Sequence, residues 1–156
     1  MARIESVLEP QARDVTGVAL QQTLVDLVDL GMVAKQAHWT VTGPRFRALH
    51  LHLDEVVEAA RRHADTVAER AAAIGVAPDG RAGTVAAGSR LSLAPAGWQH
   101  DRDVLAYFID AYAKVIAGLR ERINEVASTD PVTQDLFIAI AADLEKQYWM
   151  FQAEQD

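Results

Sequence analysis

The sequence contains no cysteine, and this absence removes whole classes of chemistry. Disulfide bonds, zinc sites built from thiolates and cysteine nucleophiles are all excluded. Any metal that the chain binds must therefore be held by nitrogen and oxygen ligands.

Long hydrophobic runs are also missing. The longest uninterrupted apolar run, Leu136 to Ala142, is far too short to cross a membrane. The first residues, Met1 to Glu9, mix charges with single apolar side chains and do not resemble a secretory leader. We therefore expect a cytoplasmic protein without a membrane partner, associated with the nucleoid only if it binds DNA.

Basic residues are fewer than acidic ones: the sequence has 15 Lys and Arg and 22 Asp and Glu, which gives a net charge of −7. This balance disfavours nucleic acid as a partner and mildly favours cations. Ordinary solubility explains the same charge equally well. The 156 residues, half of them hydrophobic, suffice for one domain with its own core.

Four long helical patterns and no convincing strand alternation predict an all-α fold. The expected helices cover about residues 15–39, 44–74, 101–127 and 131 to the end of the chain. Asp130-Pro131 is a good helix opening, since an acceptor side chain at the cap precedes proline.

The connection between the second and third helices is rich in Gly, Pro and Ala, and we expect a short helix within it around residues 84–88. Two helical pairs joined by one long crossover are typical of a ferritin-like four-helix bundle. We therefore predict an N-terminal tail over residues 1–14 and a bundle domain over residues 15–156.

Candidate metal ligands lie on one face of the second helix. His50 and Asp54 (the upstream pair) are four residues apart, as are Asp65 and Glu69 (the downstream pair). All four fall within a stripe about 100° wide. The two pairs cannot share a metal within one chain, because their midpoints are 15 residues apart, about 22 Å along a helix.

A second copy of the same helix, lying antiparallel, would bring the upstream pair of one chain opposite the downstream pair of the other. The two-fold axis would pass near Ala59 and Ala60, whose small side chains allow close approach, and would create two identical sites. His38, at the end of the first helix, can fold back towards His50. Two imidazoles and up to three carboxylates suit ferrous iron with positions open for an oxidant. The alternative is a solvated helix face with local hydrogen bonds.

The segment from Lys35 to Arg70 resembles the signature of the Dps family, ferritin-like mini-cages named for DNA protection in starved cells. The matching residues are His38-Trp39, Gly43, Phe46, Leu49-His50, Asp54, Asp65 and Ala68-Glu69-Arg70. The run DLEKQYWM, Asp143 to Met150, is similar to the last helix of the family.

This resemblance implies a hollow homododecamer that oxidises Fe(II), preferably with hydrogen peroxide rather than O2, and stores ferric mineral inside, which protects against oxidative damage. It implies that His38, His50 and Asp54 of one subunit meet Asp65 and Glu69 of the two-fold mate, in a centre for one or two irons. Trp39 matches a tryptophan beside the centre that quenches radicals, although core packing would explain it too.

The resemblance also points to an iron pore on the three-fold axes, at positions that match Asp130 and Asp135. Asp130 is equally explained as a helix cap, and Asp135 as a surface residue. His52 and His63 point away from the ligand stripe, so we expect both at the surface or in an interface. His100 should lie near the start of the third helix and bind no metal.

Two other functions remain open. A nucleoid protein that coats and protects DNA is the first, but residues 1–14 hold two arginines against three acidic residues, and the chain ends Glu154-Gln155-Asp156. Such termini offer few cations, so we expect weak DNA binding. Surface arginines elsewhere could still form a basic patch for DNA, although scattered arginines are usually only part of a solvated helix face: Arg45, Arg47, Arg61, Arg62, Arg120 and Arg122. The second is a helical adaptor protein without a redox role.

Overall fold

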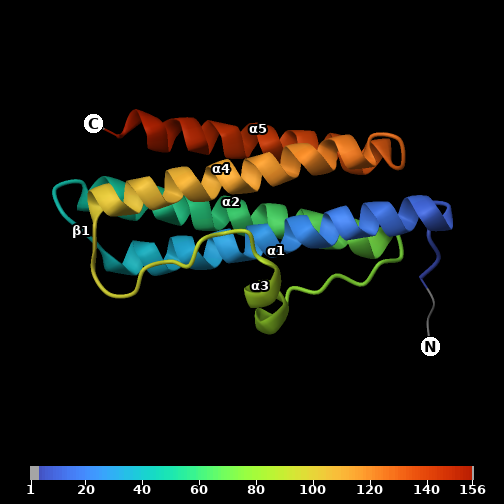
Figure 1. The fold of residues 1–156 in the computed structure, drawn as a ribbon, viewed down its shortest axis with the longest axis horizontal. Coiled ribbons are helices and arrows are strands. Elements are labelled where there is room, and N and C mark those ends of the chain that lie inside the picture. Colours follow the sequence, from blue (N-terminus) through green and yellow to red (C-terminus); the bar gives the residue numbers. More distant parts are fainter. Residues whose placement is uncertain (1–3, 156) are drawn as a thin grey trace.

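Four long helices lie side by side and carry the fold, as the periodicity predicted (Figure 1). The computed structural model describes residues 4–155. In chain order the elements are α1 (Pro10–Thr40), β1 (Val41–Thr42), α2 (Phe46–Ala73), α3 (Ala82–Gly88), β2 (Gln99–His100), α4 (Asp101–Val126) and α5 (Pro131–Ala153). The predicted all-α bundle, with a short helix in the long crossover, is confirmed.

The core lies between the four long helices, where their apolar stripes meet. α1 packs mainly on α2, α4 packs on α5, and α1 also packs on α4. Phe108, Phe137, Phe151 and Tyr112 are fully buried and fill the space between α4 and α5 and their neighbours. By length and composition alone, α1 could cross a membrane, but most of its apolar side chains are buried inside this bundle.

The helix boundaries differ from the expected ones mainly at the start of α1. This helix begins at Pro10, whereas the apolar stripe alone predicted Val15. Proline is favoured in the first turn because its missing N–H needs no helical partner there. α5 begins at Pro131 with the Asp130 side chain accepting a hydrogen bond from the N–H of Val132, so the predicted cap is confirmed.

A two-residue parallel pairing fastens the end of α1 to the start of α4. Val41 and Thr42 of β1 pair with Gln99 and His100 of β2. Gly43 follows with a φ of +116°, and a Cβ there would meet the Asp101 carboxyl carbon at 2.8 Å. The Asp101 carboxylate accepts the N–H of Arg45 at 2.7 Å, and this bond helps to hold the pKa of Asp101 below its usual value. The turn between α1 and α2 is therefore held in one conformation.

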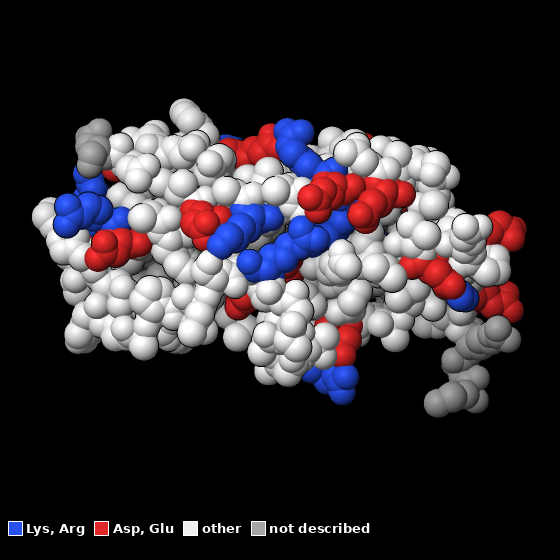
Figure 2. Space-filling model, viewed as in Figure 1, with Lys and Arg blue, Asp and Glu red and all other residues white. Residues whose placement is uncertain are grey.

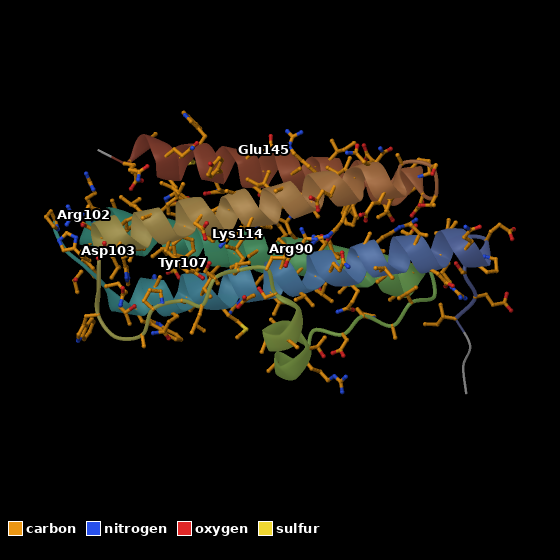
Figure 3. The ribbon with its side chains drawn as sticks, in the orientation of Figure 1. Arg90, Arg102, Asp103, Tyr107, Lys114 and Glu145 are labelled. Carbon is orange, nitrogen blue, oxygen red and sulfur yellow. The ribbon has the colours of Figure 1, made fainter. Side chains whose placement is uncertain are left out.

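The crossover between α2 and α4 is tied to the helices by polar contacts on the face shown in Figure 3. Tyr107 donates a hydrogen bond to the carbonyl of Ser92 at 2.8 Å, and Lys114 reaches the Ser92 hydroxyl at 2.6 Å. Arg90 contacts Glu121 at 3.3 Å. On the same face basic and acidic side chains lie next to one another, without a broad patch of one sign (Figure 2).

Arg122 is not on a solvated helix face, and that expectation was wrong. Its side chain is 1 % exposed and contacts Asp26 of α1, also 1 % exposed, at 2.6 Å. Thr23 accepts a second hydrogen bond from the guanidinium at 3.1 Å. Burial lowers the pKa of Arg122, although the hydrogen bond to Asp26 opposes this effect. A buried ion pair thus joins α1 to α4.

Candidate metal centre

The turn at Gly43 brings two histidines into contact. The rings of His38, in the last turn of α1, and His50, near the start of α2, stack with centroids 3.7 Å apart and planes 21° apart. Nδ1 of His38 lies 2.7 Å from the carbonyl oxygen of His50, and Nδ1 of His50 lies 2.9 Å from that of His38. A carbonyl oxygen only accepts, so each Nδ1 donates its hydrogen.

These reciprocal hydrogen bonds decide which nitrogen of each ring can bind a metal. In a neutral imidazole with a hydrogen on Nδ1, Nε2 carries the free lone pair. Histidines that bind metals usually donate the other ring N–H to an oxygen in this way, which fixes the tautomer and the ring orientation. In both His38 and His50, Nε2 is therefore the nitrogen that could bind a metal ion.

Asp54 lies next to this histidine pair. Its Oδ1 is 3.4 Å from Nδ1 of His38 and 2.6 Å from Nζ of Lys35. The hydrogen bond from Lys35 lowers the pKa of Asp54, with further help from the two histidines, so the carboxylate is ionised at neutral pH. Sequence reasoning missed Lys35, although it lies three residues before His38 and hence on the same helix face.

Asp65 and Glu69 lie farther along α2, and both are exposed. No hydrogen bond or ion pair engages either carboxylate within residues 4–155. Asp65 lines a groove of about 700 Å³ between α1 and α2. The groove is mostly apolar, and its other lining residues include Lys35, Arg61 and two exposed side chains, Met32 and Trp39, which are 54 % and 61 % exposed.

One chain does not complete a metal site. In the described part of the chain, no group of three or more His, Asp and Glu side chains could hold a metal ion. His38, His50 and Asp54 come together, whereas Asp65 and Glu69 remain apart from them. This arrangement agrees with the 15-residue separation of the two ligand pairs, which rules out a shared metal within one chain.

The predicted role of Ala59 and Ala60 was wrong. Both side chains are buried in the subunit's own bundle, at 5 % and 0 % exposure. Gly31 of α1 packs against Ala60, where a Cβ on the glycine would lie 3.5 Å from the alanine Cβ. Gly31 and Ala60 therefore allow close approach of α1 to α2 within one chain, and neither alanine offers an exposed surface to a second copy.

Two of the three remaining histidines also differ from expectation. His52 is buried, and its Nε2 lies 2.8 Å from Oε1 of Gln147 on α5. His63 is mostly buried and lies 2.6 Å from Asp143, also on α5. Neither is a surface residue, because α5 covers this side of α2. His100 does precede α4, as its N-cap.

The structure also separates the alternative interpretations of Trp39, Asp130 and Asp135. Trp39 is not a core residue, since it is exposed beside the groove. Asp130 is 2 % exposed and binds Arg70 at 2.6 Å. Burial raises the pKa of Asp130, but hydrogen bonds from Arg70 and Thr133 outweigh burial and lower it. We therefore assign Asp130 to the helix cap. Asp135 is exposed on α5.

Comparisons of the chain with a family model, with curated proteins and with solved structures all indicate the same family. The family model for the ferritin-like domain matches residues 18–156. The DNA protection during starvation protein 2 of Deinococcus radiodurans is 38 % identical over 135 residues, which cover 86 % of this chain and 56 % of that protein. The chain thus spans little more than half the length of this relative.

Two further alignments cover a larger share of both aligned proteins. The DNA protection during starvation protein of Mycolicibacterium smegmatis is 34 % identical, over 96 % of this chain and 81 % of that protein. The solved structure of Dps from Microbacterium arborescens in the high iron form has a TM-score of 0.90 and 30 % identity, and covers 96 % of this chain and 97 % of that one. The chain belongs to the Dps family of ferritin-like proteins.

Proposed function

We propose that this protein oxidises Fe(II) at a centre shared by two subunits and stores the ferric product inside a homododecameric cage in the cytoplasm. The observation that carries the proposal is the pair of oriented imidazoles beside Asp54. A metal ion bound at their Nε2 atoms would need further ligands, and the residues described for one chain do not complete such a site. Asp65 and Glu69 are uncovered carboxylates on the same helix stripe, and they are the ligands that a second copy would contribute.

An antiparallel second copy of α2 satisfies all ligands in one register. When Asp54 faces the second copy's Asp65, the four-residue spacing also sets His50 opposite its Glu69. The same register sets the exposed Glu58 opposite the exposed Arg61 midway between the two sites. Opposite charges at that position favour this alignment. The apolar groove beside Trp39 and Met32 supplies surface that such contact would bury.

The ligand set favours oxidation. Carboxylates stabilise Fe(III) over Fe(II) because they neutralise the higher charge, whereas imidazoles fix the geometry. Two Fe(II) ions supply two electrons, which reduce one hydrogen peroxide with two protons to two waters and leave two Fe(III) ions. This stoichiometry releases no hydroxyl radical. O2 is the alternative oxidant. A single bound Fe(II) supplies only one electron, and one-electron reduction of hydrogen peroxide yields a hydroxide ion and a hydroxyl radical, which gives Trp39 a role as a radical quencher.

In the single chain, the Lys35 ammonium binds the Asp54 carboxylate, which is one of the proposed iron ligands. The ammonium occupies Oδ1 of Asp54 at 2.6 Å, where iron would bind. Iron binding at this oxygen would displace Lys35, so that one cation replaces another on an ionised carboxylate. The ion pair is partly exposed, so its loss costs little.

Anaerobic loading with Fe(II), followed by hydrogen peroxide, tests the proposed activity. We expect two Fe(II) oxidised per peroxide, and iron that elutes in size-exclusion chromatography with a particle of roughly twelve subunits. A helical adaptor protein would bind no Fe(II) specifically. Iron that precipitates while the protein remains a monomer or an isolated dimer would contradict the proposal.

A closed cage needs a path for Fe(II), and we propose that Asp135 lines it. The carboxylate is exposed near the start of α5, and a ring of such groups on a three-fold axis concentrates cations. Asp135→Asn is expected to slow mineralisation several-fold at limiting Fe(II). Asp110→Asn, an exposed carboxylate on α4, is the control. Equal rates for wild type and Asp135→Asn would remove Asp135 from the path.

DNA binding is the second candidate function, because curated relatives carry the name DNA protection during starvation protein. The charges of this chain argue against strong binding. Its net charge is −7, and basic side chains on the face in Figure 2 alternate with acidic ones. We expect no submicromolar retention of plasmid DNA in a gel-shift assay at neutral pH and about 0.15 M salt. Tight retention there would favour a nucleoid protein over an iron store.

A further inference from the structure

Nδ1 of His52 is buried without a hydrogen-bond partner among the described residues. Within residues 4–155, only Nδ1 of His52 and Nε of Arg122 are buried side-chain nitrogens or oxygens without a hydrogen-bond partner. The other two nitrogens of the Arg122 guanidinium are already hydrogen-bonded. The His52 ring stacks on Phe151 with centroids 4.3 Å apart and is 7 % exposed, so water does not reach Nδ1 freely. An orphaned buried nitrogen of this kind calls for a missing partner.

The other side of the ring decides what kind of partner fits. Nε2 of His52 lies 2.8 Å from Oε1 of Gln147. An amide oxygen only accepts, so Nε2 carries the hydrogen and Nδ1 carries a free lone pair. A ring N–H donated to an oxygen, with the second nitrogen free, is the arrangement of metal-binding histidines.

A carboxylate oxygen lies near this nitrogen. Oε1 of Glu154 lies 3.7 Å from Nδ1, which is too far for a hydrogen bond. A bridging water, bonded at about 2.8 Å to both atoms, would hold them roughly 4.4 Å apart. Two ligands at about 2.1 Å from one metal ion lie roughly 3.4 to 3.6 Å apart, at tetrahedral to trigonal angles. The observed distance is nearest to that of two ligands of one ion.

We propose that His52 Nδ1 and the Glu154 carboxylate bind a divalent transition-metal ion, with water completing its coordination. Imidazole and carboxylate suit Zn²⁺, Co²⁺ or Fe²⁺. Glu154 is the C-cap of α5 and is 34 % exposed, so its side chain can admit the ion from outside. The bound ion would tie the last turn of α5 to α2, at the end of the bundle where the C-terminus lies (Figure 1).

This site is separate from the proposed iron-oxidising centre. His52 follows His50 by two residues, which turns its side chain about 200° round the helix. Metal at His52 would therefore neither compete for the oxidising ligands nor require a second subunit. It is independent of the proposed function.

A Co²⁺ titration in a background without the oxidising centre tests the proposal. The background is His50→Gln/Asp54→Asn/Asp65→Asn/Glu69→Gln, which removes four of the five proposed ligands of that centre. We expect one Co²⁺ per subunit with visible d–d absorption. Adding Glu154→Gln should weaken this binding at least tenfold, and adding Gln147→Leu should weaken it about 10- to 100-fold through loss of the ring's orienting partner.

Glu145→Gln, a second glutamate on α5, is the matched control and should leave Co²⁺ binding unchanged. Glu154 is partly exposed, so its replacement tests the site without disturbing the core around His52. Circular dichroism checks the fold of each variant. The proposal is overturned if the background protein binds no Co²⁺, or if Glu154→Gln and Glu145→Gln bind it equally well.

Discussion

Asp65→Asn/Glu69→Gln should abolish fast ferrous oxidation and leave the fold intact. The two carboxylates are exposed and have no hydrogen-bond partner among the residues that the structure describes, so no packing is lost. In the proposed centre, however, they are the ligands that a second subunit adds to iron held by the paired imidazoles. Loss of an outer-shell partner alone costs 10- to 100-fold in metal affinity or activity, so removing two direct ligands should cost at least about 100-fold.

Stopped-flow oxidation of Fe(II) by hydrogen peroxide measures this loss. Glu55→Gln is the matched control, because Glu55 is also an exposed carboxylate on α2 but lies outside the ligand stripe. Circular dichroism and particle size should match those of wild type in both variants. A rate for Asp65→Asn/Glu69→Gln equal to that of Glu55→Gln would show that the downstream pair takes no part in the reaction.

Asp26→Asn should lower the free energy of unfolding by about 3 to 5 kcal/mol. Asp26 and Arg122 are both 1 % exposed and 2.6 Å apart, so removing the carboxylate leaves a guanidinium charge buried without its counter-ion. Asp26 also accepts the N–H of Arg90 at 3.2 Å, which anchors the crossover. The loss therefore affects α1, α4 and the crossover that leads into α4.

Denaturant unfolding at one fixed subunit concentration measures this effect, because assembly also contributes to apparent stability. Asp110→Asn, which breaks the exposed contact with Lys114, should cost at most about 1 kcal/mol. The double variant Asp26→Leu/Arg122→Met should recover most of the stability, since two apolar side chains need no counter-ion. A loss below about 1 kcal/mol for Asp26→Asn would mean that the pair is hydrated in solution.

Local signals were enough to predict the helices and the crossover. The apolar positions of α2 repeat at three- and four-residue intervals, which identifies the helix, and Asp130-Pro131 marks the start of α5. The start of α1 was misplaced, because residues 10–14 continue the helix as mostly exposed positions that add little to the apolar stripe. An apolar stripe shows which residues of a helix are buried and does not show at which residue the helix begins.

Polar residues with distant partners were the ones misjudged. Arg122 pairs with a residue 96 positions away, and His52 with one 95 positions away. Spacing within one helix contains no information about such pairs, so Arg122 was expected on a solvated helix face and His52 at the surface or in an interface. The candidate centre was easier, since His38 and His50 flank one tight turn. The tautomer of each ring, however, depends on carbonyl oxygens across that turn, which only the structure shows.

The most direct test of the shared centre is complementation between two inactive variants. Asp65→Asn/Glu69→Gln lacks the downstream pair, and His50→Gln/Asp54→Asn lacks the upstream pair. In a mixed dimer, one of the two sites receives intact ligands from both subunits, and the other receives none of these four. Random pairing makes half of the dimers mixed, so roughly a quarter of all sites should regain activity.

The measurement is peroxide-driven Fe(II) oxidation after the two variants have been dissociated, mixed in equal amounts and reassembled. We predict about a quarter of the wild-type rate for the mixture and almost none for either variant reassembled alone. A mixture no more active than its two components, despite confirmed mixed dimers, would contradict a metal centre shared between subunits.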